Sequence, residues 1–404
     1  MLAAARALNR LHIVGETLRH TRNVLASAAP QWLRPQLHAH FPERSGPRFD
    51  EYRLPKANDE RQALAEPIGA DGRALLLAIY AADSPAWLRE VPAVQTLRTV
   101  WLQQYHAVPA EMPMRWQAGD ALPPGSQIIN SPYDVDARYG HKRTTEWTGY
   151  KVHLTERCDE DGPHFITHVH TSVAPGPDDA ALEPIHEALA AKELLPAEHL
   201  VDAGYPDADA LALVASQQQG IDLVGPVTTN QHWQQRAQEG FDIASVALDW
   251  EQKVARCPNG QQSCKWSPTH DARGNAMINI RFPRAACAEC VSRSKGTRSE
   301  TGPRELTVRP QAQHQALQAA RKRCKTAEFT QRYAARAGIE GTLSEGVRVS
   351  DLRRSRDVGH AKTHLQHVQC AAAINLRRFG AWAMDVPHAK TRTPAFVKLM
   401  AQAA

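Results

Sequence analysis

One change of periodicity constrains the fold of this chain more than any other feature. Residues 147–155 and 164–173 alternate β-branched or aromatic residues with polar ones, which is the period of two expected of half-buried strands. Between them, residues 158–163 read Cys-Asp-Glu-Asp-Gly-Pro, a sequence rich in turn formers. These three segments predict a β-hairpin.

After the hairpin the period lengthens to that of a helix. Residues 179–194 carry apolar residues at helical spacing, and the apolar run at 199–202 is short enough for a strand. The same order recurs once, with a helix expected over 208–217 and a strand over 221–227. Strands that alternate with helices in this way predict an α/β core.

The segments on either side of this predicted core have different patterns of apolar and polar residues. Further helices are expected over 71–80, 93–105, 313–324, 329–340 and 363–382, and short strands over 247–255 and 276–282. We therefore divide the chain into a helical region (1–130), a first part of the core (131–227), a β-rich insertion with four Cys (228–305) and a helical completion of the core (306–404).

Length and composition exclude several classes of protein. A chain of 404 residues with 42% hydrophobic and 23% charged residues is long enough for two or three packed units and is close to the globular average. The longest clearly apolar stretch, residues 74–82, is too short to cross a bilayer, and arginines interrupt the segment where a secretory signal needs an apolar run. Seven cysteines, an odd number, favour a reducing compartment and thiols that are free or metal-bound rather than paired. We expect no membrane partner and a cytoplasmic location.

Asp202 is the first candidate for chemistry. It ends a predicted strand and is followed by Ala-Gly-Tyr205, in which the glycine allows a sharp turn. Strand ends in α/β sheets are where ligand and metal sites gather. The alternative is that Asp202 only caps the next helix.

A second candidate lies near the C-terminal end. Tyr333, Arg336 and Glu340 stand at i, i+3 and i+7, so they are expected on one face of one helix. A surface Arg–Glu ion pair is the alternative explanation. The glycines at 338 and 341 favour function, because they make a poor composition for a helix kept only for stability.

Basic residues are concentrated just after Glu340. The net charge of the chain is +5, which fits a polyanionic partner without identifying one. The candidates for contacting phosphate groups are Arg348, Arg353, Arg354 and Lys362. A solvated helix face is the alternative for this run.

Four motifs together resemble insertion-sequence transposases of the DDE type. They are Gly149-Tyr-Lys-Val-His-Leu154, Asp202-Ala-Gly-Tyr205, Tyr333-x2-Arg336-x3-Glu340 and Thr363-His-Leu-Gln-His367. The resemblance spans essentially the whole chain and implies a ribonuclease-H-like core in which Asp202 and Glu340 are the second and third members of the DDE triad. Such carboxylates hold Mg²⁺ or Mn²⁺ for phosphodiester chemistry. The resemblance places Tyr333 and Arg336 beside the metal, with Arg336 suited to grip a phosphate.

The sequence departs from the family pattern in two places. A Lys that often follows the Glu by seven residues is replaced by Val347, with Arg348 next to it. The family's first Asp precedes a helix that resembles residues 2–10, so we expect that this chain begins just past that Asp and is N-terminally truncated. The less favoured alternative is that Asp134 or Asp136 serves as the first Asp.

The cysteines of the predicted insertion form a separate constellation. Four of them, with the spacing Cys-x6-Cys and then Cys-x2-Cys, are a candidate structural Zn²⁺ site: Cys257, Cys264, Cys287 and Cys290. Ordinary buried thiols are the alternative.

The resemblance implies an enzyme that cuts double-stranded DNA at the ends of an insertion sequence and joins those ends to target DNA. Because two ends must be brought together, a homodimer is expected. Two other interpretations stay open. One is a non-catalytic DNA-binding remnant of a transposase, and the other is a metal-dependent nuclease of another kind, which would share the carboxylates but not the closing helix motif.

Overall fold

The chain divides into two compact units. The computed structural model describes residues 2–36, 54–109, 111–159, 162–216, 220–229, 232–272, 274–386, 395, 399 and 400. The first unit comprises Met1–Thr155, Val169–Gly176 and Gly346–Ala404, and the second comprises Glu156–His168 and Pro177–Glu345. Each unit is therefore built from segments that lie far apart in the sequence. Within the described part of the chain, no helix is both long enough and apolar enough to cross a membrane.

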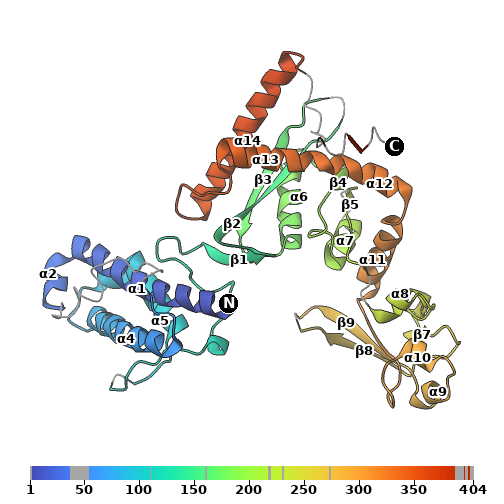
Figure 1. Cartoon of the computed structure of the whole chain (residues 1–404), viewed down its shortest axis with the longest axis horizontal. Helices are drawn as coiled ribbons and strands as arrows, with labels where there is room; N and C mark the ends of the chain where they lie inside the picture. Colours follow the sequence, from blue (N-terminus) through green and yellow to red (C-terminus); the bar gives the residue numbers. More distant parts are fainter. Residues whose placement is uncertain are drawn as a thin grey trace. The chain divides into compact units, whose positions relative to one another are not determined.

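Three long helices form the N-terminal part of the first unit: α1 (Leu2–Ala28), α4 (Asn58–Tyr80) and α5 (Pro92–Gln104) (Figure 1). Their apolar faces meet in one buried cluster that includes Leu18 and Leu97. Shorter helical elements accompany them: α2 (Pro30–Leu33), η1 (Arg34–Gln36), η3 (Ala86–Glu90) and η4 (Gly119–Ala121). The two helices predicted in this region are confirmed, although α4 begins well before the predicted start.

Helices α4 and α5 approach closely because two glycines of α4 leave room for two aromatic rings, Trp101 of α5 and Tyr105 directly after it. The Trp101 indole N–H donates to the carbonyl oxygen of Gly69 at 2.9 Å, and the Tyr105 hydroxyl donates to the carbonyl oxygen of Ala65 at 2.8 Å. A Cβ built on Gly72 would lie 2.0 Å from Trp101 Cζ2. The aromatic contacts therefore depend on the absence of a side chain there.

An antiparallel sheet in the order β1-β2-β3 follows in the chain. Its strands are β1 (Arg138–Lys142), β2 (Thr145–Glu156) and β3 (Ile166–Val173). The predicted hairpin is confirmed as β2 and β3. The sequence did not predict β1, which is polar and pairs with the first half of β2, Gly140 facing Trp147.

The second unit contains a strand–helix–strand arrangement: β4 (Glu198–Leu200), α7 (Ala208–Ser216) and β5 (Asp222–Val224), preceded by η5 (Asp179–Ala181) and α6 (Leu182–Ala190). Strands β4 and β5 are parallel, with Glu198 facing Asp222 and Leu200 facing Val224. The pairing continues one residue further, because Val201 N–H donates to the Val224 carbonyl oxygen at 2.9 Å. The predicted alternation of helices and strands is confirmed here, with strands shorter than expected.

A cysteine-containing module, residues 232–310, interrupts this arrangement. Its elements are α8 (Trp233–Ala237), η6 (Ile243–Ser245), β6 (Ala247–Asp249), β7 (Val254–Arg256), β8 (Lys265–His270), β9 (Ala276–Arg281), α9 (Arg284–Ala288), α10 (Arg293–Gly296) and β10 (Glu305–Val308). The module has its own buried cluster, which includes Ile280 and Phe282. The strand expected over 247–255 is wrong in its length, because the chain turns back at Lys253, whose φ is 53°, and forms two strands instead.

Helices complete the chain: α11 (Gln311–Arg323), α12 (Ala327–Ala334), η7 (Ala335–Ala337), α13 (Gly338–Ser350) and α14 (His360–Ala383). The prediction of one continuous helix over 329–340 is wrong. A 3₁₀ turn lies between α12 and α13, so Tyr333, Arg336 and Glu340 come from three consecutive elements. Glycine at 338, a weak helix former, stands where the second α-helix starts.

Candidate active site

Asp202 lies in a tight turn directly after the parallel strand pair of the second unit. Its side-chain oxygen accepts a hydrogen bond from the Ala203 N–H at 2.7 Å, and its carbonyl oxygen accepts one from Tyr205 N–H at 3.0 Å. A Cβ on Gly204 would lie 2.9 Å from Asp178 Oδ2, so a larger residue there would require the Asp178 side chain to shift. About half of the Asp202 side chain is exposed, at 51%. The carboxylate is therefore held in place and remains accessible.

Arg336 contacts the carboxylates of both Asp202 and Glu340. Its Nη2 lies 3.7 Å from Asp202 Oδ2, and its Nη1 donates a hydrogen bond to Glu340 Oε1 at 3.1 Å. The guanidinium is largely covered, with 19% of the side chain exposed, whereas Glu340 is 62% exposed. Two accessible carboxylates from distant segments thus converge on one positive charge. The two carboxylates already stabilise the positive charge of the guanidinium, so they are also suited to hold a divalent metal ion.

Two tyrosines lie around this charge cluster. Burial raises the pKa of the Tyr205 hydroxyl, and the nearby carboxylates of Asp178 and Asp202 raise it further, while Arg336 opposes the rise. Burial also raises the pKa of Tyr333, whose ring stacks on Phe329 at a centroid distance of 5.4 Å. Both hydroxyls therefore stay protonated near neutral pH and can act as hydrogen-bond donors.

Glu156 is a carboxylate of this region that the sequence did not single out. Its side chain is 6% exposed and accepts a hydrogen bond from the Thr342 hydroxyl, two residues beyond Glu340. His164 Nδ1 lies 3.9 Å away on the other side of the turn. The contact fixes α13 against the end of β2 and so positions Glu340. The sequence offered little signal for it, since a hairpin-end Glu is ordinarily solvated.

Asp134 and Asp136, the less favoured candidates for the first Asp, have structural roles in the first unit. Asp134 accepts hydrogen bonds from the Tyr150 hydroxyl at 2.7 Å and from the Gly359 N–H at 3.0 Å. Asp136 accepts a hydrogen bond from the His360 N–H at 3.4 Å. These bonds tie the segment before β1 to the start of α14. Among all described residues, no three His, Cys, Asp or Glu side chains are grouped so as to hold a metal ion.

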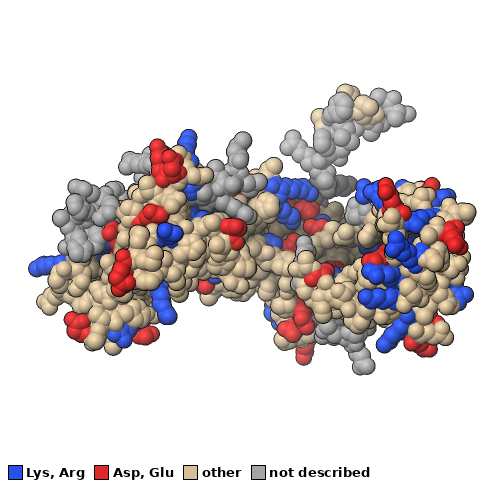
Figure 2. Space-filling view, turned by 90° about the horizontal axis from the view of Figure 1, so that it is seen from below, with Lys and Arg blue, Asp and Glu red and all other residues tan. Residues whose placement is uncertain are grey.

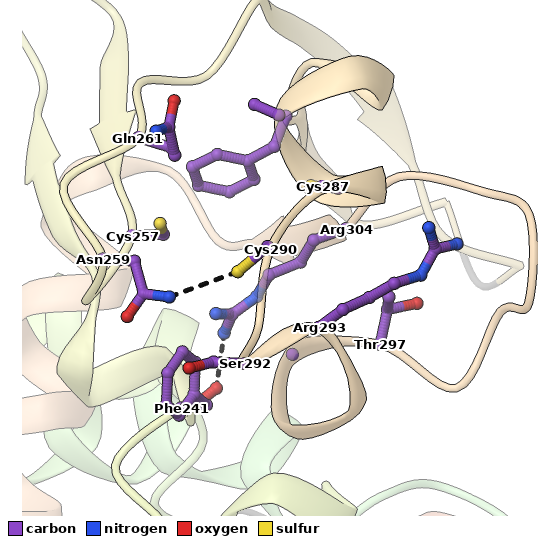
Figure 3. Close-up of a pocket in the computed structure, with 13 residues that line it drawn as sticks. Phe241, Cys257, Asn259, Gln261, Cys287, Cys290, Ser292, Arg293, Thr297 and Arg304 are labelled. Atoms are coloured by element: carbon purple, nitrogen blue, oxygen red, sulfur yellow. Dashed lines mark hydrogen bonds between the residues drawn. The ribbon is translucent and has the colours of Figure 1, made fainter.

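The four cysteines predicted to bind zinc are not gathered into one site, and that prediction is corrected. Cys257, Cys287 and Cys290 line a small cavity of about 30 Å³, and Figure 3 shows it beside Arg304. Cys264 does not line the cavity. It is exposed ahead of β8 and contacts the carbonyl oxygen of Arg281 at 3.4 Å.

The cavity thiols instead contribute to packing. Cys257 and Cys287 pack against the apolar cluster of the module, and Cys290 Sγ accepts a hydrogen bond from Asn259 Nδ2 at 3.2 Å. Burial lowers the pKa of Arg304, whose guanidinium donates to the Phe241 carbonyl oxygen. The alternative of partly buried, ordinary thiols therefore fits better than a zinc site.

The basic residues expected to contact phosphate lie at the end of α13 and the start of α14. All four are exposed and form no ion pair with another described residue: Arg348, Arg353, Arg354 and Lys362. Arg353 also lines a cleft of about 720 Å³ in the first unit, together with Tyr133, Trp147 and Tyr150. Their positive charge is thus available to an external anion.

The closing Thr363-His-Leu-Gln-His367 motif has a packing role. His364 Nδ1 and His367 Nδ1 lie 3.1 Å and 2.8 Å from the Thr171 hydroxyl on β3. Burial, followed by the neighbouring histidines, lowers the pKa of His367 to about 4. The two imidazoles therefore fasten α14 to the sheet.

The fold and the site define a mixed helix-and-sheet protein with a pair of carboxylates of the kind that binds divalent cations. Residues 256–379 match the family model of the transposase DDE domain. Over this region the chain is similar to the DDE domain of transposases. The matched region contains Glu340, Arg336 and Tyr333, and Asp202 lies before it. No curated protein and no solved structure matches the chain significantly.

Proposed function

We propose that this protein is a DNA transposase that cleaves double-stranded DNA at the ends of an insertion sequence and joins those ends to target DNA in the presence of Mg²⁺. The observation that carries the proposal is the convergence of Asp202 and Glu340 on Arg336. Glu340 and Arg336 belong to the matched DDE domain, and Asp202 extends the site beyond it.

The proposed roles follow from the geometry. Asp202 and Glu340 are the residues that would hold the metal, and a bound divalent metal supplies charge stabilisation to the attacking and leaving oxygens of a phosphodiester. Arg336 offers a planar pair of donors to a phosphate. Tyr333, which stays protonated, can donate a hydrogen bond to a phosphate oxygen. Glu156 and Thr342 hold α13 so that Glu340 faces the site.

Exposed positive charge supports DNA as the partner. The four basic residues at the end of α13, in the loop that follows and at the start of α14 have no acidic partner among the described residues. Lys and Arg side chains also gather over the cysteine-containing module, at the right of the face in Figure 2. Arg284, Lys295 and Arg298 of that module are exposed. Such surfaces attract the phosphate backbone of DNA irrespective of its sequence.

Cleavage of labelled duplex DNA that carries the terminal repeats flanking the gene tests the proposal. We expect nicking in Mg²⁺ and its loss in Asp202→Asn, because a neutral amide binds a divalent cation more weakly than a carboxylate does. Asp209→Asn is the matched control, since that side chain is 52% exposed and lies in the next helix of the same unit. Cleavage that persists in Asp202→Asn would contradict the assignment.

DNA binding alone is the second candidate function. The exposed basic residues do not depend on the carboxylate site, so a remnant without catalysis would keep them. Duplex binding by the wild-type chain without any cleavage, in Mg²⁺ or Mn²⁺, would favour the remnant. Cleavage that is lost in Asp202→Asn while binding persists would favour the enzyme.

A further inference from the structure

Arg336 is held by the two carboxylates that the proposed function assigns to a metal. Its contacts are one hydrogen bond of 3.1 Å to Glu340 and a longer contact of 3.7 Å to Asp202. Within the described residues, neither carboxylate forms another ion pair. The guanidinium is therefore the counter-ion of the pair.

A neighbouring arginine shows how a permanently fixed guanidinium is held in the same fold. Arg332, four residues earlier, donates through Nε and Nη2 to Glu198, and its Nη2 also contacts Asp222 Oδ2 at 2.5 Å. These contacts are shorter and more numerous than those of Arg336. Arg332 joins the starts of β4 and β5, where a structural clamp is expected. Arg336 is more loosely held and lies beside an accessible site.

The position of Arg336 in the chain allows its side chain to move away from the two carboxylates. It lies in the 3₁₀ turn between α12 and α13, flanked by alanines at 335 and 337 and followed by Gly338. Its positive charge opposes the rise in the pKa of the Tyr205 and Tyr333 hydroxyls, so both polar groups lie near the guanidinium. A long arginine side chain can rotate away from the carboxylates without crossing a large side chain of its own turn.

A divalent cation on Asp202 and Glu340 would stand next to the guanidinium, and two positive charges at that separation repel each other. We propose that Arg336 is an internal counter-ion that occupies the cation position between Asp202 and Glu340, that divalent metal displaces it, and that the displaced guanidinium binds a DNA phosphate. This inference rests on the function proposed above. It makes metal and DNA binding cooperative, because each favours the same displaced position of Arg336.

Binding of Mn²⁺ to the full-length chain without DNA, followed by electron paramagnetic resonance of the free ion, tests the displacement. Arg336→Gln removes the competing charge, so we expect it to bind Mn²⁺ at least about tenfold more tightly than wild type, because repulsion between such close charges is appreciable even when solvent screens it as strongly as bulk water. Arg336→Lys keeps the charge and should stay near the wild-type affinity. Lys322→Gln, an equal change of charge on an exposed site of α11, is the matched control and should also stay near wild type.

Addition of a short duplex tests the coupling. DNA should raise the Mn²⁺ affinity of wild type more than that of Arg336→Gln, since the variant has no guanidinium to transfer. Thermal unfolding of each variant checks that all the proteins in the comparison are folded to the same extent. Equal or weaker Mn²⁺ binding by Arg336→Gln would overturn the inference.

The outcomes separate this inference from the proposed function. If Mn²⁺ binds wild type and binding is lost in Asp202→Asn, but Arg336→Gln is unchanged, only the inference fails. If neither wild type nor Arg336→Gln binds Mn²⁺, the proposed metal chemistry fails, and the inference fails with it. Binding that appears only in Arg336→Gln would support the inference strongly.

Discussion

At Gly72 the helix α4 has no side chain, and the Trp101 ring of α5 fills the space. Gly72→Ala should lower the free energy of unfolding by about 1–3 kcal/mol, because the new Cβ would lie 2.0 Å from Trp101 Cζ2 and the ring must shift. Urea denaturation measures this change. Gly341→Ala, in α13 with nothing within 4 Å of its Cβ, is the matched control and should stabilise the protein by roughly 0.5 kcal/mol. Equal effects of the two substitutions would show that packing at Gly72 is loose.

A pair of contacting imidazoles in the second unit makes stability depend on pH. His186 Nε2 and His199 Nδ1 lie 2.9 Å apart, and burial, with His186 nearby, lowers the pKa of His199 to about 4. The folded state therefore binds fewer protons than the unfolded state between about pH 6.5 and 4. Stability should be full above pH 6.5 and should fall by at most about 3 kcal/mol as the pH drops toward 4.

Comparison of His199→Gln with wild type at pH 7.5 and pH 5 tests this dependence. The substitution should reduce the difference between the two unfolding free energies, whereas His270→Gln, at an exposed position, should leave the difference as in wild type. An unchanged pH dependence in His199→Gln would assign it to other groups.

At the scale of elements, patterns that repeat over several residues were predictable, and features set by tertiary contacts were not. Alternation predicted β2 and β3, and apolar spacing predicted α4 and α5. Strand β1 was missed, because its polar sequence is ordered only by pairing with β2. The turn at Lys253 was missed as well, since a left-handed lysine has no sequence signature comparable to glycine.

The candidate site shows the same limit. Motifs picked out Asp202, Arg336 and Glu340, and the structure brings these three together. They did not indicate that Arg336 would occupy a 3₁₀ turn, nor that Glu156 would fix α13. Both depend on contacts between segments distant in sequence, which no local pattern encodes.

The basic segment from the end of α13 to the start of α14 leads to a further prediction. Replacing Arg348, Arg353, Arg354 and Lys362 together by Gln should weaken binding to any short duplex. It should reduce the slope of log K against log salt by about 3–4, since each phosphate contact contributes roughly 0.9. Fluorescence anisotropy over a salt series measures the slope. The control replaces four exposed basic residues of the helical part, Arg34, Lys56, Arg98 and Arg115, and should keep the wild-type slope. A slope that falls equally in both variants would argue against a specific role for this segment.

At the scale of the whole molecule, neither unit is continuous in sequence. The first unit needs helix α14 as well as the N-terminal helices, and the second unit contains the end of β2 with everything from Pro177 to Glu345. The first unit therefore cannot be completed during synthesis until its last segment has been made. Such long-range closure is typical of slow folding.

The clamp at Arg332 and the contact at Arg336 have a consequence for tolerance to changes in chain length. Glu198 begins β4 and Asp202 follows its end four residues later, and their partners Arg332 and Arg336 are four residues apart as well. One inserted residue between the arginines would rotate the second by about 100° relative to the first, so both contacts could not be kept. Insertions and deletions should therefore be rare between these residues in descendants of this gene, even where single substitutions accumulate.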